Sequence, residues 1–184
     1  GGAYATLSAV VLSRGTLHAA GPYYSPNVKI RSRALATNTP PHGAFRGFGA
    51  PQSLFALEKH MEFCARKLNS NPAIFRKNNL VKKGQLLGCG QWVKEEIEIA
   101  SVLEKALTVS GFQEKRKRFL ATNKNSVVKK GIGLAVFMHG AGFTGSGETF
   151  LSSIASVKAT AEGKIEVLTS NTEIGQGTNT IFAQ

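Results

Sequence analysis

A glycine-rich loop that runs directly into a helix is the strongest local signal in this chain. The loop, residues 43–52, reads G-A-F-R-G-F-G-A-P-Q, and Pro51 falls in the first turn of the expected helix, where a missing N–H costs little. Apolar residues then recur at spacings of three and four, which predicts an amphipathic helix with Glu58 and Lys59 on its polar side. The apolar positions are Leu54, Leu57, Met61, Cys64 and Leu68.

Further helices are expected on both sides of this junction. The small apolar residues of 3–18 predict a helix that ends near Arg14–Gly15, with a strand as the alternative because of the pair Val10 and Val11. A short helix should follow the N-cap residue Asn71. Residues 93–122 carry two helical segments, with a break at Ser110–Gly111. Helical structure should therefore dominate the first two thirds of the chain.

Strand patterns occur mainly later in the sequence. Apolar and polar residues alternate over 27–38, and 130–140 has the character of a strand. Glu162–Gly163 predicts a hairpin turn between two further strands. We expect an α+β fold with mixed sheets and packed helices, divided into two lobes at a polar basic turn, with residues 1–125 in the first lobe and 126–184 in the second.

Composition limits the possible partners. The 184 residues include 23 Lys+Arg against 11 Asp+Glu, a net charge of +12 that would suit an anionic partner. The basic residues are dispersed with few interleaved aromatics, so we favour membership of a larger assembly over nucleic-acid binding. Cys64 and Cys89 make neither a disulfide framework nor a metal ligand set, which favours a reduced, cytoplasmic compartment, and no membrane-spanning segment is visible.

The ends of the chain and two further loops complete the pattern. The chain begins without Met and stops at Gln184, where a helix should be starting, so we expect it to be part of a longer polypeptide. Residues 140–148 read G-A-G-F-T-G-S-G-E, and residues 172–180 read T-E-I-G-Q-G-T-N-T. Glycines allow close backbone approach, and helix starts offer N–H donors, so the three loops together suit an anionic, oxygen-rich ligand such as a phosphate or pterin. Each loop alone is as well explained by a tight turn, and none matches a phosphate-binding or dinucleotide fingerprint.

In combination, these loops resemble the molybdenum-binding subunit of the xanthine dehydrogenase and aldehyde oxidase family. G-A-F-R-G-F-G-A-P-Q resembles the hallmark loop of that family, and T-E-I-G-Q-G resembles its later Gly-Gln-Gly loop. G-F-T at 142–144 resembles the substrate-lining Phe-Thr pair of its purine-oxidising members. L-S-R-G-T-L-H resembles the segment with the substrate-contacting arginine, and Arg14 lies 32 positions before Arg46, which fits the family. The resemblance covers nearly the full length and is loose between 80 and 128.

The resemblance implies a set of cofactor contacts. The backbone amide of Arg46 would lie beside the molybdenum, with Gly47 in the same cofactor-binding loop. Gly175 and Gln176 would hydrogen-bond the molybdopterin. Iron–sulfur clusters and FAD would be carried by partner subunits or domains.

The resemblance also implies substrate contacts. Phe48 and Phe143 would hold a flat heteroaromatic ring by face and edge, and Thr144 and Arg14 would contact its oxygens. Arg14 would also act catalytically, because it would stabilise negative charge as it builds on the ring. These four residues together favour a purine over an aldehyde.

The implied reaction is oxidation of a purine such as xanthine or hypoxanthine. Attack of a Mo–OH group on an electron-poor carbon would be followed by hydride transfer to a Mo=S group. The family's catalytic glutamate lies outside this chain, so the chain alone should be inactive, and the full complex is expected to be a homo-oligomer. Aldehyde oxidase and nicotinate-type dehydrogenases of N-heterocycles stay open as alternatives, as does a basic anion- or RNA-binding module without catalysis.

Other residues near these loops receive simpler interpretations. We expect Phe45 to be a core residue. His139 precedes a glycine loop without a paired acid or metal set, so we interpret it as structural. Glu148 and Glu173 are loop carboxylates that do not match the family's catalytic glutamate.

Overall fold

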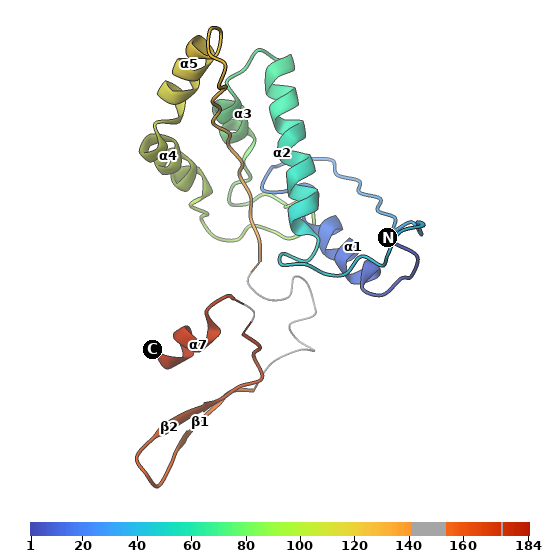
Figure 1. The fold of residues 1–184 in the computed structure, drawn as a ribbon, viewed down its shortest axis with the longest axis vertical. Helices are drawn as coiled ribbons and strands as arrows, with labels where there is room; N and C mark the ends of the chain where they lie inside the picture. Colours follow the sequence, from blue (N-terminus) through green and yellow to red (C-terminus); the bar gives the residue numbers. More distant parts are fainter. Residues whose placement is uncertain (141–153, 174) are drawn as a thin grey trace. The chain divides into compact units, whose positions relative to one another are not determined.

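The computed structural model describes residues 1–140, 154–173 and 175–184, and these residues form two compact units. The first unit is Gly1–His139 and the second is Gly140–Gln184. Across the described ranges, helices and one two-stranded antiparallel sheet make up the regular structure (Figure 1), which confirms the expected α+β class. The lobe boundary expected between residues 125 and 126 stays a prediction.

Five helices build the first unit, and neighbouring helices pack in pairs. Helix α2 contacts both α1 and α3, and α4 contacts α5. Gly111, in a left-handed conformation with φ of 60°, separates α4 from α5 at the predicted break. Helix α1 extends through Gly15 to Leu17 rather than ending at Gly15. The helices are α1 (Ser8–Leu17), α2 (Ala50–Lys67), α3 (Pro72–Asn79), α4 (Ile99–Ser110) and α5 (Phe112–Thr122).

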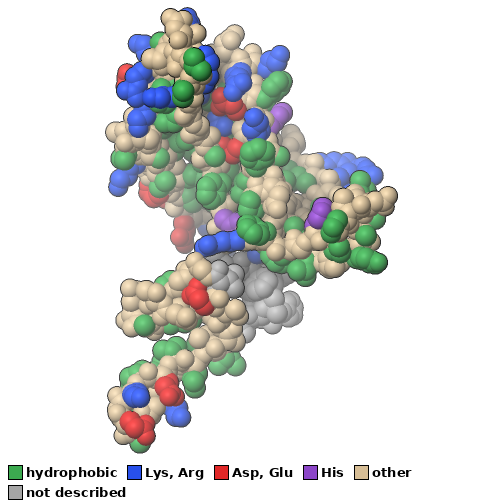
Figure 2. Space-filling model, in the orientation of Figure 1, with side chains coloured by type: hydrophobic (Ala, Val, Ile, Leu, Met, Phe, Trp, Pro, Cys, Tyr) green, Lys and Arg blue, Asp and Glu red, His purple; other side chains and the backbone are tan. Residues whose placement is uncertain are grey.

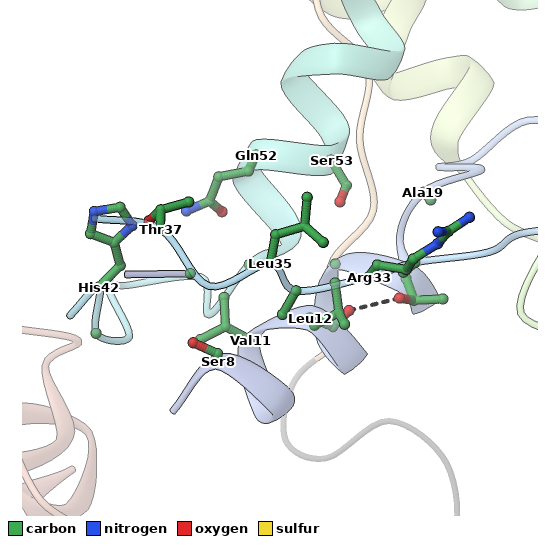
Figure 3. Close-up of a pocket in the computed structure, with 17 residues that line it drawn as sticks. Ser8, Val11, Leu12, Ala19, Arg33, Leu35, Thr37, His42, Gln52 and Ser53 are labelled. Atoms are coloured by element: carbon green, nitrogen blue, oxygen red, sulfur yellow. Dashed lines mark hydrogen bonds between the residues drawn. The ribbon is translucent and has the colours of Figure 1, made fainter. Parts of the chain in front are cut away.

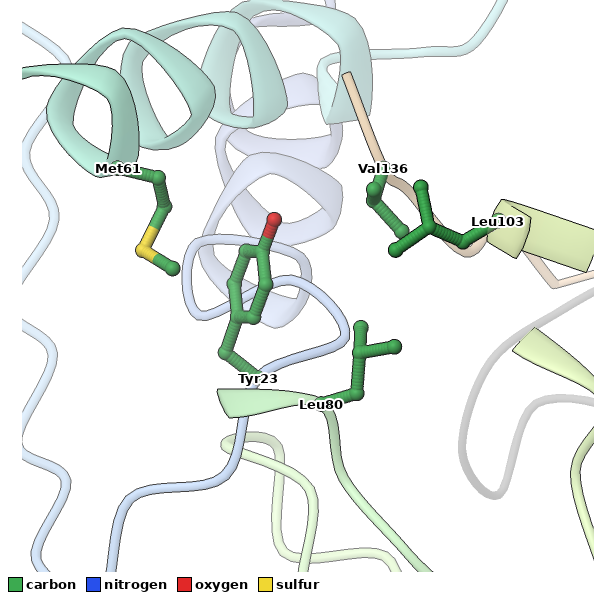
Figure 4. Close-up of a cluster of buried hydrophobic side chains, with 5 residues drawn as sticks. All are labelled: Tyr23, Met61, Leu80, Leu103 and Val136. Carbon is green, nitrogen blue, oxygen red and sulfur yellow. The ribbon is translucent and has the colours of Figure 1, made fainter. Parts of the chain in front are cut away.

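The core of the first unit joins segments that are far apart in the sequence. Its buried side chains come from the loop after α1, from α2, from the residue after α3, from α4 and from the segment before His139 (Figure 4). An isolated antiparallel bridge between Tyr23 and Leu80 closes one side of this core. The five residues are Tyr23, Met61, Leu80, Leu103 and Val136.

The two strands expected at 27–38 and 130–140 do not form. Most of 27–38 is exposed, and it belongs to no sheet of the described residues. Of this described segment, only the end is held by backbone hydrogen bonding, from Thr37 N to Gly2 O at 3.1 Å, so the alternating pattern has no full ladder partner. Residues 131–139 do alternate between exposed and inward-facing side chains, as a strand would. The backbone N–H of Val136, however, donates to the carboxylate of Glu58 at 3.0 Å rather than to a neighbouring strand.

The second unit contains the predicted hairpin. Strand β1 (Ser156–Ala159) pairs antiparallel with β2 (Ile165–Leu168), and Gly163 takes a φ of 78° in the turn. Helix α7 (Thr178–Ala183) begins within the Gly-Gln-Gly loop sequence at 172–180. Among the described residues, none of the helices combines the length and the apolar character that crossing a bilayer requires.

Candidate functional site

The loop before α2 has an unusual backbone. Three consecutive residues have positive φ: Gly47 (89°), Phe48 (55°) and Gly49 (103°). The N–H of Phe48 donates to Phe45 O at 2.7 Å, and the N–H of Ala50 donates to Gly47 O at 3.1 Å. A phenylalanine in the left-handed region is strained, and strained residues of this kind cluster at functional sites.

Glycine is required where this loop meets its neighbours. A Cβ at Gly49 would lie 2.2 Å from the carbonyl oxygen of Val11 in α1, and a Cβ at Gly47 would lie 2.5 Å from Pro51. The loop backbone therefore rests directly on the backbone of α1. Such close backbone packing leaves the loop fixed in shape, as a cradle for a cofactor must be.

The side chains of the loop differ in exposure. Phe48 is half-buried, and the Arg46 side chain is exposed. Phe45 is 83% exposed, so the expectation that it belongs to the core was wrong. Phe45 lies in a short turn, and no helix or other segment of the first unit covers its ring.

Arg14 belongs to the same unit and lies in the last turn of α1. It is half-buried, and its carbonyl oxygen accepts hydrogen bonds from the backbone N–H of His18 at 3.2 Å and from the His18 ring at 2.9 Å. The structure therefore brings the helix of Arg14 and the loop of Arg46, Gly47 and Phe48 against one another.

Two histidines lie between these segments. The rings of His18 and His139 stack with centroids 5.0 Å apart, and His139 Nε2 lies 3.4 Å from Gly47 O. Burial lowers the pKa of His18, and repulsion from His139 and Arg14 acts in the same direction. The interpretation of His139 as merely structural missed its contact with the glycine loop.

A buried carboxylate anchors the elements behind the site. Glu58 accepts hydrogen bonds from Arg76 Nε at 2.8 Å, from Val136 N at 3.0 Å and from the Tyr23 hydroxyl. Burial and the contact with Glu58 together raise the pKa of Tyr23. Glu58 is 7% exposed, so its placement on the polar side of α2 was wrong. Its position one helical turn after Leu54 was the signal that could have identified it.

A separate cavity of about 550 Å³ opens between α1, the start of α2 and residues 32–43 (Figure 3). Polar side chains including Ser8, Arg33, His42 and Gln52 line it. None of the predicted site residues of the first unit lines this cavity, so it does not coincide with the predicted substrate site.

In the second unit, a carboxylate organises the Gly-Gln-Gly loop. Glu173 accepts hydrogen bonds from the backbone N–H groups of Gly175 at 2.6 Å, Gly177 at 3.2 Å and Asn179 at 3.2 Å. These bonds, from Gly177, Gly175 and Asn179, lower the pKa of Glu173. The exposed Gln176 donates from Nε2 to the carbonyl of Thr172 at 2.7 Å. Gly175 and Gln176, two of the predicted cofactor-binding residues, thus lie in a loop whose backbone is held by Glu173. The sequence did not predict this role for Glu173.

Some predicted site residues lie beyond what the structure describes. Phe143 and Thr144 are outside the described residues. Within the described ranges, no group of three or more His, Cys, Asp or Glu side chains could hold a metal ion.

A run of basic residues, Lys115 to Arg118, lies in α5. Figure 2 shows Lys and Arg side chains concentrated at the end of the first unit around α5. Within this run, Arg116 pairs with Glu62 at 3.4 Å, and Arg118 lies over the ring of Phe119. The basic run is therefore partly engaged in contacts within the first unit.

Comparison with known proteins decides the family. Residues 1–80 match a family model described as molybdopterin cofactor-binding domain, and residues 105–184 match a second model with the same description. The chain belongs to the molybdopterin cofactor-binding domain family. The resemblance drawn from the glycine loops is thereby confirmed.

The proteins similar to this chain carry names that refer to different substrates. The nicotinate dehydrogenase large molybdopterin subunit of Eubacterium barkeri is 37% identical over 119 residues, which cover 62% of this chain and 28% of that protein. Xanthine dehydrogenase of Oryza sativa subsp. japonica is 32% identical over 186 residues, covering 100% of this chain and 13% of that protein. The solved aldehyde oxidoreductase from Desulfovibrio desulfuricans ATCC 27774 matches with a TM-score of 0.72 and 26% identity, over 90% of this chain and 17% of that one. The chain thus spans less than a third of each of these relatives.

Proposed function

We propose that this chain is part of a molybdenum hydroxylase that oxidises a purine such as xanthine or hypoxanthine. The observation that carries the proposal is the packing of α1, which bears Arg14, against the strained loop of Arg46, Gly47 and Phe48. That packing supports a single site in which the Arg14 side chain would contact the substrate and the loop backbone would contact the cofactor.

The loop backbone fits a cofactor. Arg46 and Gly47 would contact it through their main chain, since the close packing of Gly49 on Val11 O of α1 fixes the course of the loop backbone. Gly175 and Gln176 of the second unit would hydrogen-bond the pterin. When bound, the molybdenum cofactor supplies the oxidation chemistry, and its electrons leave through iron–sulfur clusters and FAD on partner subunits or domains.

The chain's own side chains would bind and orient the substrate. Phe48 and Phe143 would hold a flat ring, since aromatic walls position planar ligands with little loss of entropy. Thr144 and Arg14 would contact the ring oxygens. A guanidinium that meets charge developing in the transition state contributes about 10²-fold or more in rate.

A nicotinate-type substrate is the second candidate, and the relative from Eubacterium barkeri at 37% identity favours it. In that case Arg14 would pair with the ring carboxylate rather than with a purine oxygen. An aldehyde is the third, since the aldehyde oxidoreductase structure matches most of this chain. The three candidate substrates differ in whether an anionic oxygen, or an oxygen that becomes anionic during the reaction, would face Arg14.

The test compares substrates on the intact protein with its partner subunits. Reduction of an electron acceptor is followed with xanthine, nicotinate and benzaldehyde, for wild type and Arg14→Met. The proposal predicts that xanthine is preferred and that Arg14→Met lowers kcat/KM for xanthine about 10²-fold. Arg31→Met, at an exposed position, is the matched control and should change nothing. A preference for nicotinate or benzaldehyde, or an unchanged kcat/KM in Arg14→Met, would contradict the purine assignment.

The remaining parts of the proposal concern assembly and location. We propose that the protein works in a homo-oligomeric complex with iron–sulfur and FAD subunits, and that residues 1–125 and 126–184 belong to different lobes of the molybdenum subunit. Cys64 and Cys89 are both free thiols, which supports a cytoplasmic location.

A further inference from the structure

We propose that His18 and His139 form a histidine clamp that holds the glycine loop at Gly47 against the end of α1. Both are positioning residues, and their importance for catalysis rests on the proposed function. The clamp joins three segments that are distant in the sequence: α1, the loop before α2, and the extended segment 131–139.

The hydrogen bonds assign the roles of the two rings. A carbonyl oxygen can only accept, so His18 donates from Nδ1 to Arg14 O at 2.9 Å, and His139 donates from Nε2 to Gly47 O at 3.4 Å. The rings then stack at 5.0 Å with an angle of 21° between their planes. One continuous path of contacts therefore runs from the backbone of Arg14 to the backbone of Gly47.

Each side of the clamp is held from behind. His18 is the C-cap residue of α1, and α1 packs on α2. On the other side, Val136 is buried and its N–H is fixed by Glu58, three residues before His139. His139 thus stands at the end of an anchored segment and not on a free tail.

The carbonyl that the clamp holds is central to the loop. Gly47 O also accepts the N–H of Ala50 at 3.1 Å, which closes the turn into α2. Phe48 follows directly, with its strained φ of 55°. Holding Gly47 O against α1 would therefore fix the separation between Arg14 and Phe48, the two predicted substrate contacts of the first unit.

Hydrogen exchange of the intact protein, measured by mass spectrometry, tests the clamp. His139→Ala removes the donor, and His139→Gln places an amide donor where Nε2 was. His60→Ala is the matched control, because His60 is an exposed histidine that stacks on Phe63 at 6.3 Å, away from the loop. In His139→Ala, amides of residues 44–50 should exchange about fivefold faster, as expected for the loss of one hydrogen bond. They should stay near wild type in His139→Gln and His60→Ala.

Three results would overturn the clamp. The first is unchanged exchange of 44–50 in His139→Ala. The second is no recovery in His139→Gln. The third is an equal loss of protection throughout α2 in both His139 variants, because global destabilisation would then account for the faster exchange of the loop amides.

Turnover gives the second readout. On the substrate that wild type oxidises fastest, His139→Ala should lower kcat/KM at least fivefold and His139→Gln should restore it. Exchange is a property of the polypeptide, so it decides the clamp even if the purified protein holds no molybdenum. A wild type without molybdenum would contradict the proposed function alone.

Discussion

Replacing Glu58 by alanine should destabilise the first unit far more than replacing Glu62, which lies one turn later on the same helix. Glu58 accepts hydrogen bonds from Arg76, from the backbone of Val136 and from Tyr23. Its removal would leave the Arg76 side chain, which is 1% exposed, without its main counter-charge. It would also release the segment that leads to His139.

The structure sets the expected magnitude. Breaking a buried ion pair by removing one partner costs about 3–5 kcal/mol. Arg76 would keep Pro72 O at 3.1 Å and Glu62 at 3.4 Å, so we expect the lower end, about 3 kcal/mol or roughly 10²-fold in the opening equilibrium. Glu62 is 22% exposed and bonds its arginines at 3.4 Å, so Glu62→Ala should cost about 1 kcal/mol or less.

Hydrogen exchange of the most protected amides of α2 and α3 measures this difference in the intact protein. Glu58→Ala should raise their exchange roughly 10²-fold, and Glu62→Ala less than tenfold. The double variant Glu58→Met with Arg76→Met should recover much of the loss, because neither partner is then left charged and buried. Equal effects of Glu58→Ala and Glu62→Ala, or a double variant worse than Glu58→Ala, would refute the reasoning.

Three further changes test the local structure, each by urea unfolding of the intact protein. Gly49→Ala should destabilise it by about 2–4 kcal/mol, because its Cβ would meet Val11 O at 2.2 Å and φ is 103°, whereas Gly84→Ala, in open space at φ of 79°, should cost about 1 kcal/mol. Asn71→Ala should cost about 1 kcal/mol by removing the N-cap of α3, and Asn71→Asp should not. Burial and a carboxylate neighbour raise the pKa of Tyr23, so the folded state keeps a proton that the unfolded state loses, and stability should fall as the pH rises above 10.0. Tyr23→Phe should flatten that alkaline fall, and an unchanged slope would contradict the assignment.

Short sequence patterns predicted the helices well, because the start and the end of a helix depend on residues that are close together in the sequence. The N-cap of α3 needs only Asn71 and the two amides that follow it, and the break at Gly111 needs one left-handed residue. Residues 131–139 were harder, because their backbone partner is a glutamate 78 positions away. The side chains of 131–139 alternate in burial as those of a strand do, but the sequence pattern could not supply a neighbouring strand.

The loop before α2 was predicted in outline for the same reason, whereas the roles of its residues stay predictions. The glycines at 43–49 indicated a loop that runs into a helix start, and three positive φ values occur there. The burial of Glu58 and the contact of His139 with Gly47 depend on tertiary packing, which no short pattern contains. The roles of Gly175 and Gln176 stay predictions.

Molybdenum and pterin content test the central claim most directly. The intact protein is purified from a host that makes the cofactor, beside a related xanthine dehydrogenase prepared in the same way, and both components are measured per polypeptide. A molybdenum hydroxylase should contain molybdenum and pterin in equimolar amounts with the chain. A protein free of both, from a host that loads the relative, would contradict the proposal.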